Sequence, residues 1–136
     1  MINEFTISCD PSVLPEIRKF ISEVLRSNNL PEVESHKMIL AVDEICANLI
    51  IHANNCDPTH HLNISVDVKP GIKVVFTIKD KGRTFDFSNY REPSMDEIVS
   101  SRKKGGLGLM LVRRIMDDIE FTTEKNYNIC RLVKNL

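Results

Sequence analysis

The sequence carries no excess of charge of either sign. Its 136 residues include 18 Lys and Arg against 19 Asp and Glu, which gives a net charge of −1 at pH 7. Proteins that bind nucleic acid over a broad surface usually show a basic face. The charge balance therefore predicts no direct contact with nucleic acid, and any charged partner must be met by a local patch.

The cysteines lack the close pairing of a zinc site. Cys9, Cys46, Cys56 and Cys130 are far apart in the chain and show no C-x-x-C spacing. No stretch resembles the apolar core of a secretory signal. We therefore interpret the cysteines as reduced structural thiols and expect a cytoplasmic protein.

No apolar run approaches the roughly 20 residues that a membrane-spanning helix needs, so the sequence predicts no membrane segment. The apolar fraction of 42% and the charged fraction of 27% are those of an ordinary globular protein. Because a domain usually takes roughly 100–200 residues, residues 1–136 are expected to form a single domain.

Hydrophobic periodicity predicts five strands and three helices. The strands are expected near 4–9, 62–68, 72–78, 119–124 and 129–133. The helices are expected near 10–28, near 31–54, and from behind the glycines at 105–108 to about 117–118. A long polar segment, 81–104, interrupts this order, and loops of that length are commonly functional. The order predicts an α+β two-layer sandwich, with a mixed, mostly antiparallel sheet and three helices on one face.

One flank of the second predicted helix carries three polar side chains. Glu44, Asn48 and His52 follow one another at a spacing of four residues, beside a core stripe of apolar residues. Spacing alone leaves two interpretations open, a solvated edge of the helix and a functional site.

Three segments combine residue types that suit nucleotide binding. They are Glu44-Ile-Cys-Ala-Asn48, Asp80-Lys-Gly82 and Gly105-Gly-Leu-Gly108. A helix that opens behind glycines offers unpaired N–H groups to phosphate. A carboxamide oxygen is a suitable Mg²⁺ ligand, and a carboxylate one turn away can accept a proton. Each signal alone is weak. The chain has neither a G-x-x-x-x-G-K-[ST] P-loop nor the H-R-D motif of a protein kinase.

In this order, the three segments resemble the motifs of the GHKL ATPase superfamily. The segment Ala41-Val-Asp-Glu-Ile-Cys-Ala-Asn-Leu-Ile-Ile-His-Ala53 is similar to its N box, and Asp80-Lys-Gly-Arg-Thr-Phe-Asp86 to its D-x-G box. Residues 105–112, followed by Met116-Asp117, are similar to its second glycine box. The resemblance spans residues 4–134 and is strongest to the stand-alone bacterial anti-sigma factor serine/threonine kinases.

The resemblance implies an ATP site between the helices and a lid at residues 86–104. Asn48 would coordinate Mg²⁺, and Glu44 would act as the general base. Asp80 would contact the adenine amino group. The other residues expected to contact the nucleotide are Gly82, Gly105, Gly106, Leu107, Gly108 and Thr123. Thr84 departs from the longer D-x-G-x-G form, and the roles of Lys103 and Lys104 stay open.

The resemblance also implies a function and partners. The expected protein binds Mg-ATP, sequesters a sigma factor, phosphorylates a STAS-type antagonist and forms a homodimer through its first strand and helix. One alternative is a non-enzymatic switch that uses ATP only to set its conformation for a partner. Another is a stand-alone histidine-kinase-type ATPase domain.

Overall fold

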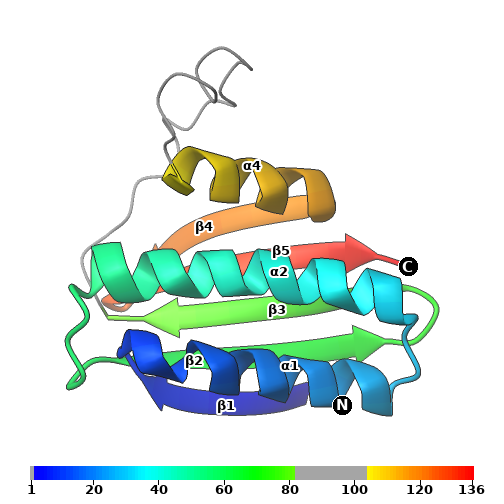
Figure 1. Ribbon diagram of the computed structural model, residues 1–136, viewed down its shortest axis with the longest axis horizontal. Helices are drawn as coiled ribbons and strands as arrows, with labels where there is room; N and C mark the ends of the chain where they lie inside the picture. The colour runs from blue at the N-terminus through cyan, green and yellow to red at the C-terminus, as the bar shows by residue number, and fades with distance from the viewer. Residues whose placement is uncertain (1, 82–103) are drawn as a thin grey trace.

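The computed structural model of the protein describes residues 2–81 and 104–136. Its five strands form one sheet in the order β1-β2-β3-β5-β4 (Figure 1), and each neighbouring pair is antiparallel. The strands are β1 (Ile2–Ser8), β2 (His61–Lys69), β3 (Lys73–Asp80), β4 (Asp118–Glu124) and β5 (Tyr127–Asn135).

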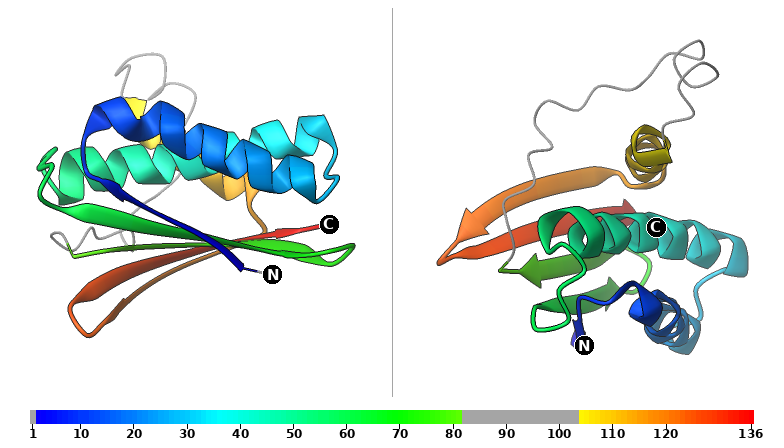
Figure 2. Two further views of the ribbon diagram at one scale, coloured as in Figure 1. Left: turned by 90° about the horizontal axis from the view of Figure 1, so that it is seen from below. Right: turned by 60° about the vertical axis from the view of Figure 1, so that its left-hand side comes forward.

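Within residues 2–81 and 104–136, three helices lie on one face of this sheet (Figure 2). They are α1 (Leu14–Ser27), which follows the short 3₁₀ turn η1 (Pro11–Val13), α2 (Glu32–Asn48) and α4 (Lys104–Ile115). A π-helical turn, η2 (Leu49–Ala53), continues α2. The predicted two-layer α+β sandwich is confirmed, but the sheet formed by the described residues is antiparallel throughout and not mixed.

The first helix begins where its sequence predicts. The Asp10 side chain accepts a hydrogen bond from the Ser12 N–H at 3.0 Å, and Pro11 supplies a backbone preset for the first turn. The apolar side of α1 then buries four side chains against the sheet and α2. They are Ile17, Ile21, Val24 and Leu25.

The core lies between the two layers and is built from alternate strand residues. On β2 the side chains that face the helices are Leu62, Ile64, Val66 and Val68, all buried. Their neighbours along the strand face the helix-free side, as the two-residue period of a strand requires. The two sides of one strand thus meet different environments.

The third helix differs from the prediction at its start. It begins at Lys104, so the glycines form its first turn instead of preceding it. Glycine is a weak helix former, and packing of α4 on α2 supplies the compensating contacts. At the other end, Asp117 fixes the helix to β5. Its N–H donates to the Val133 carbonyl at 2.8 Å, and its Oδ2 accepts from the Asn135 N–H at 2.7 Å.

The structure bears on two sequence-based expectations, that the cysteines are reduced and that no segment spans a membrane. Cys9, Cys46, Cys56 and Cys130 are all free thiols, and burial raises the pKa of Cys9 to about 11 and of Cys130 to about 12. None of the helices formed by residues 2–81 and 104–136 has the length and apolar character that a bilayer crossing requires.

Candidate functional site

Asp80 lies at the end of β3 on the side that faces the helices, where it is only 1% exposed. The Asn54 Nδ2 donates a hydrogen bond to its Oδ2 at 3.0 Å. A carboxylate is rarely buried to this degree unless it is held by hydrogen bonds or charge. The structure therefore places the predicted adenine-reading residue in an enclosed and partly fixed position.

Thr123 belongs to the same row of the sheet as Asp80. Asp80 pairs in register with Asn128 of β5, and Asn128 pairs with Thr123 of β4. Paired residues point to the same face, and strands are spaced by about 4.8 Å, which puts Thr123 roughly 10 Å from Asp80. Asp80 and Thr123, both predicted to lie near the adenine, thus share one face and one end of the sheet.

Glu44 lies where α2 packs against α4, directly beside Gly108. Gly108 is buried, and a Cβ atom built on it would overlap Oε2 of Glu44 and lie 2.8 Å from Cδ. Only a residue without a side chain permits this approach. The structure therefore brings together the predicted general base and one glycine of the predicted phosphate-binding segment.

The environment of Glu44 alters its protonation. Partial burial, and then the negative charge of Asp43, raise the pKa of the Glu44 carboxyl. Asp43 is itself paired with Arg18 of α1 at 2.9 Å, a contact that joins the two helices. A carboxylate with a raised pKa is better matched to proton transfer near neutral pH.

Asn48 ends α2 one turn after Glu44 and is 8% exposed. Its Nδ2 is buried and finds no hydrogen-bond partner within residues 2–81 and 104–136. Leaving such a donor unsatisfied costs about 1–3 kcal/mol, so this NH₂ group is expected to donate to an acceptor atom of a ligand. The solvated-edge interpretation is therefore wrong for Asn48, although it fits the exposed His52.

Three more of the predicted contacts lie in α4. Gly105, Gly106 and Leu107 fall in its first turn, where backbone N–H groups have no acceptor within the helix. Gly82 and residues 86–103 of the predicted lid lie outside the described residues. Among the predicted phosphate contacts, Gly108 lies beside Glu44, where α2 packs against α4.

The donor set fits a nucleotide-borne magnesium ion better than a resident metal. The described parts of the chain hold no cluster of three or more His, Cys, Asp or Glu side chains that could bind a metal alone. Magnesium usually takes only one or two protein ligands, because substrate phosphates and water complete its coordination. One buried carboxamide, Asn48, matches that requirement.

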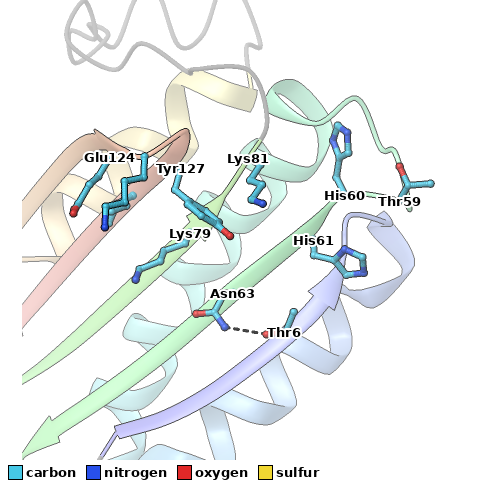
Figure 3. A pocket seen from close by; sticks show the side chains of 11 residues that line it. Thr6, Thr59, His60, His61, Asn63, Lys79, Lys81, Glu124 and Tyr127 are labelled. Atoms are coloured by element: carbon cyan, nitrogen blue, oxygen red, sulfur yellow. Dashed lines mark hydrogen bonds between the residues drawn. The ribbon is translucent and has the colours of Figure 1, made fainter.

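A hollow of about 820 Å³ lies on the opposite, helix-free face of the sheet (Figure 3). The Lys81 Nζ lies 4.8 Å from the centre of the Tyr127 ring, and the Asn63 Nδ2 donates to the Thr6 Oγ1 at 2.9 Å. The side chains around it are Thr6, Thr59, His60, His61, Asn63, Lys79, Lys81, Glu124, Lys125, Tyr127 and Ile129. Among the residues that the structure describes, none of those predicted to contact the nucleotide lines this hollow, so its size does not point to the predicted site.

Comparison with known proteins identifies the family of the chain. The model of the histidine kinase-like ATPase domain matches residues 7–134. The chain belongs to the histidine kinase-like ATPase family. Among its relatives, the serine-protein kinase RsbW of Halalkalibacterium halodurans is 27% identical over 122 residues, which are 86% of this chain and 73% of that protein.

Two solved structures share the fold of this chain. The structure of the RsbU and RsbW domains of a Mycobacterium tuberculosis protein has a TM-score of 0.70 at 11% identity, and the match covers 98% of this chain but 32% of that one. A chain of the SiaB–SiaC complex from Pseudomonas aeruginosa has a TM-score of 0.63 at 11% identity, and the match covers 98% of this chain and 89% of that one.

Two residues near the site were not found by sequence reasoning. Asn54 stands at the end of the second predicted helix, yet it is buried against Asp80. Arg18 lies within the first predicted helix, yet it pairs with Asp43 beside Glu44. Neither belongs to a motif, and both act through partners distant in the sequence.

Proposed function

We propose that this ATPase-family chain is a protein serine/threonine kinase of the anti-sigma type. It binds Mg-ATP, phosphorylates a Ser or Thr of a STAS-domain antagonist and sequesters a sigma factor. The observation that carries the proposal is the pairing of Glu44, whose pKa is raised, with Gly108 on one side and the buried Asn48 one turn away. The relatives named serine-protein kinase support the choice of acceptor.

In this proposal each described residue has a distinct role. Glu44 accepts the proton of the acceptor hydroxyl and aligns it for transfer. Asn48 holds the metal through its carboxamide oxygen, while Asp80 accepts a hydrogen bond from the adenine amino group. Magnesium, when bound, neutralises charge on the phosphates.

The glycines support the nucleotide through the backbone. The first turn of α4, with Gly105, Gly106 and Leu107, offers N–H groups to the phosphates, and Gly108 leaves room for the Glu44 carboxyl. Gly82 and Thr123 contribute the other contacts near the adenine. Positioning and charge neutralisation then account for most of the rate enhancement of phosphotransfer.

Phosphotransfer is tested with radiolabelled ATP and candidate STAS antagonists. The proposal expects label on a Ser or Thr of one antagonist, dependent on Mg²⁺. Tight binding of ATP without labelled protein would support a non-enzymatic switch instead. Label on a histidine would support a histidine-kinase-type activity.

Partner binding is tested by a pull-down with this chain as bait, with and without Mg-ATP. The proposal expects a sigma factor and an antagonist whose capture responds differently to the nucleotide. It also expects a homodimer, for which β1 offers an edge strand of the sheet. Light scattering of the purified protein measures that state directly.

A further inference from the structure

A chain of hydrogen bonds runs from the surface to Asp80. Asn54 is 1% exposed, and its Nδ2 donates both to the Leu49 carbonyl at 2.8 Å and to the Asp80 Oδ2 at 3.0 Å. Its Oδ1 lies 3.0 Å from the His60 Nδ1. Beyond His60, the Asp57 carboxylate lies 3.6 Å from the His60 Nε2. One buried amide thus connects the end of α2, the end of β3 and the loop before β2.

The partners of Asn54 fix which way its amide points. The Leu49 carbonyl and the Asp80 carboxylate can only accept hydrogen bonds, so both must face the NH₂ group. The Oδ1 then faces His60, whose Nδ1 must carry the proton for this contact to be a hydrogen bond. The local fold supports the same orientation, because the π-helical turn η2 brings the Asn54 N–H to the Leu49 carbonyl at 3.0 Å.

We propose that Asn54 is a positioning residue that holds the Asp80 carboxylate in the orientation that selects adenine. This inference rests on the proposed function, in which Asp80 accepts a hydrogen bond from the adenine amino group. Asn54 does not touch the nucleotide itself. It fixes one carboxylate oxygen, so that Asp80 meets the amino group without first having to order its side chain. His60 supports this role by holding the amide from behind.

The test compares two nucleotides in two proteins. Equilibrium binding of Mg-ATP and of purine riboside triphosphate, which lacks the amino group, is measured for the wild type and for Asn54→Ala. The wild type should prefer ATP by about 10- to 100-fold, the usual contribution of a hydrogen bond to a charged group. In Asn54→Ala this preference should fall to within about threefold of unity, mainly through weaker ATP binding.

Three further variants keep the result interpretable. Asn63→Ala removes an amide bonded to Thr6 on the opposite face and should leave the preference unchanged. Asn54→Leu keeps a similar volume but has no group that can donate to Asp80, so it should lose the preference as well. His60→Ala should weaken it by a smaller factor. Asn54→Ala is expected to fold, because the Leu49 carbonyl keeps its bond to the Asn54 N–H.

The outcomes separate this inference from the proposed function. If the wild type binds ATP and prefers it, but Asn54→Ala weakens both nucleotides equally, Asn54 is only structural and the inference is overturned. A wild-type preference retained by Asn54→Leu would overturn it too. If the wild type binds neither nucleotide, or binds both equally, Asp80 does not select the adenine amino group as the proposed function states. The inference about Asn54 is then wrong as well.

Discussion

The two faces of the sheet use the same strands for different purposes. Lys79 and Asp80 are consecutive in β3, yet Lys79 is exposed beside the open hollow, whereas Asp80 is buried beneath the helices. The helix-free face carries many charged groups, among them Lys81 and Lys125. On the helix side, Asp80 and Asn48 are buried, and burial raises the pKa of Glu44. The better evidence for chemistry is therefore the environment of each polar group, and not the volume of the nearest hollow.

Glu44→Gln gives the largest contrast between a site residue and a solvated one. We expect phosphotransfer to fall by about 10²- to 10⁴-fold, the usual contribution of a positioned base, while binding of Mg-ATP changes little. Glu32→Gln, on an exposed position of the same helix, should change neither. Full phosphotransfer in Glu44→Gln would contradict the role of Glu44 as the general base.

The same variant tests stability against pH. Because burial raises the pKa of Glu44, the folded state favours the protonated form. The stabilisation is present below the unfolded-state pKa and is lost as the pH rises through the folded-state pKa. At neutral pH the Tm of Glu44→Gln should therefore equal or exceed that of the wild type, and this advantage should shrink as the pH falls. A lower Tm at neutral pH would contradict the stated environment.

Gly108→Ala tests the close packing of α4 on the Glu44 carboxyl. The added Cβ would meet the end of a flexible side chain, which can move aside, so the fold should survive. We expect phosphotransfer to fall by about tenfold, since a misplaced base loses most of its effect. The helix itself should gain up to about 1 kcal/mol.

Gly71→Ala is the matched control for that substitution. Gly71 has a φ of +72° and nothing within 4 Å of an added Cβ. Alanine there should destabilise the protein by about 1–2 kcal/mol through backbone strain, with the specific activity of the folded protein unchanged. Equal activity losses in the two variants would refute a specific role for Gly108.

Asp43→Asn gives the smallest expected effect. It removes the negative charge that helps to raise the pKa of Glu44. The acidic limb of the pH–rate profile should therefore move to lower pH. The ion pair with Arg18 is lost as well, at a cost of up to about 1 kcal/mol for a partly exposed pair. A shift of the profile to higher pH would contradict the assigned cause.

Much of this site could be predicted because its parts are local in the sequence. The four-residue spacing of Glu44 and Asn48 places both on one flank of a helix, and Asp80 ends a strand of clear alternation. The alternation of the strands and the spacing of the helices likewise predicted both layers of the fold.

Contacts between distant segments could not be predicted in this way. Asn54 meets Asp80 across 26 residues, and Arg18 meets Asp43 across 25. Both contacts depend on how α2 lies against β3 and α1, which no local pattern encodes. The start of α4 was misplaced for a similar reason, because packing on α2 overrides the weak helix propensity of its glycines.

The central claim is that the nucleotide binds on the helix face and not in the hollow on the other side. The most direct test is the affinity for Mg-ATP of Asp80→Asn and of Lys79→Ala, two neighbours in β3, measured by calorimetry. The account predicts a loss of about 10- to 100-fold for Asp80→Asn, from the charged hydrogen bond to the base, and wild-type affinity for Lys79→Ala. A loss in Lys79→Ala with wild-type affinity in Asp80→Asn would contradict it.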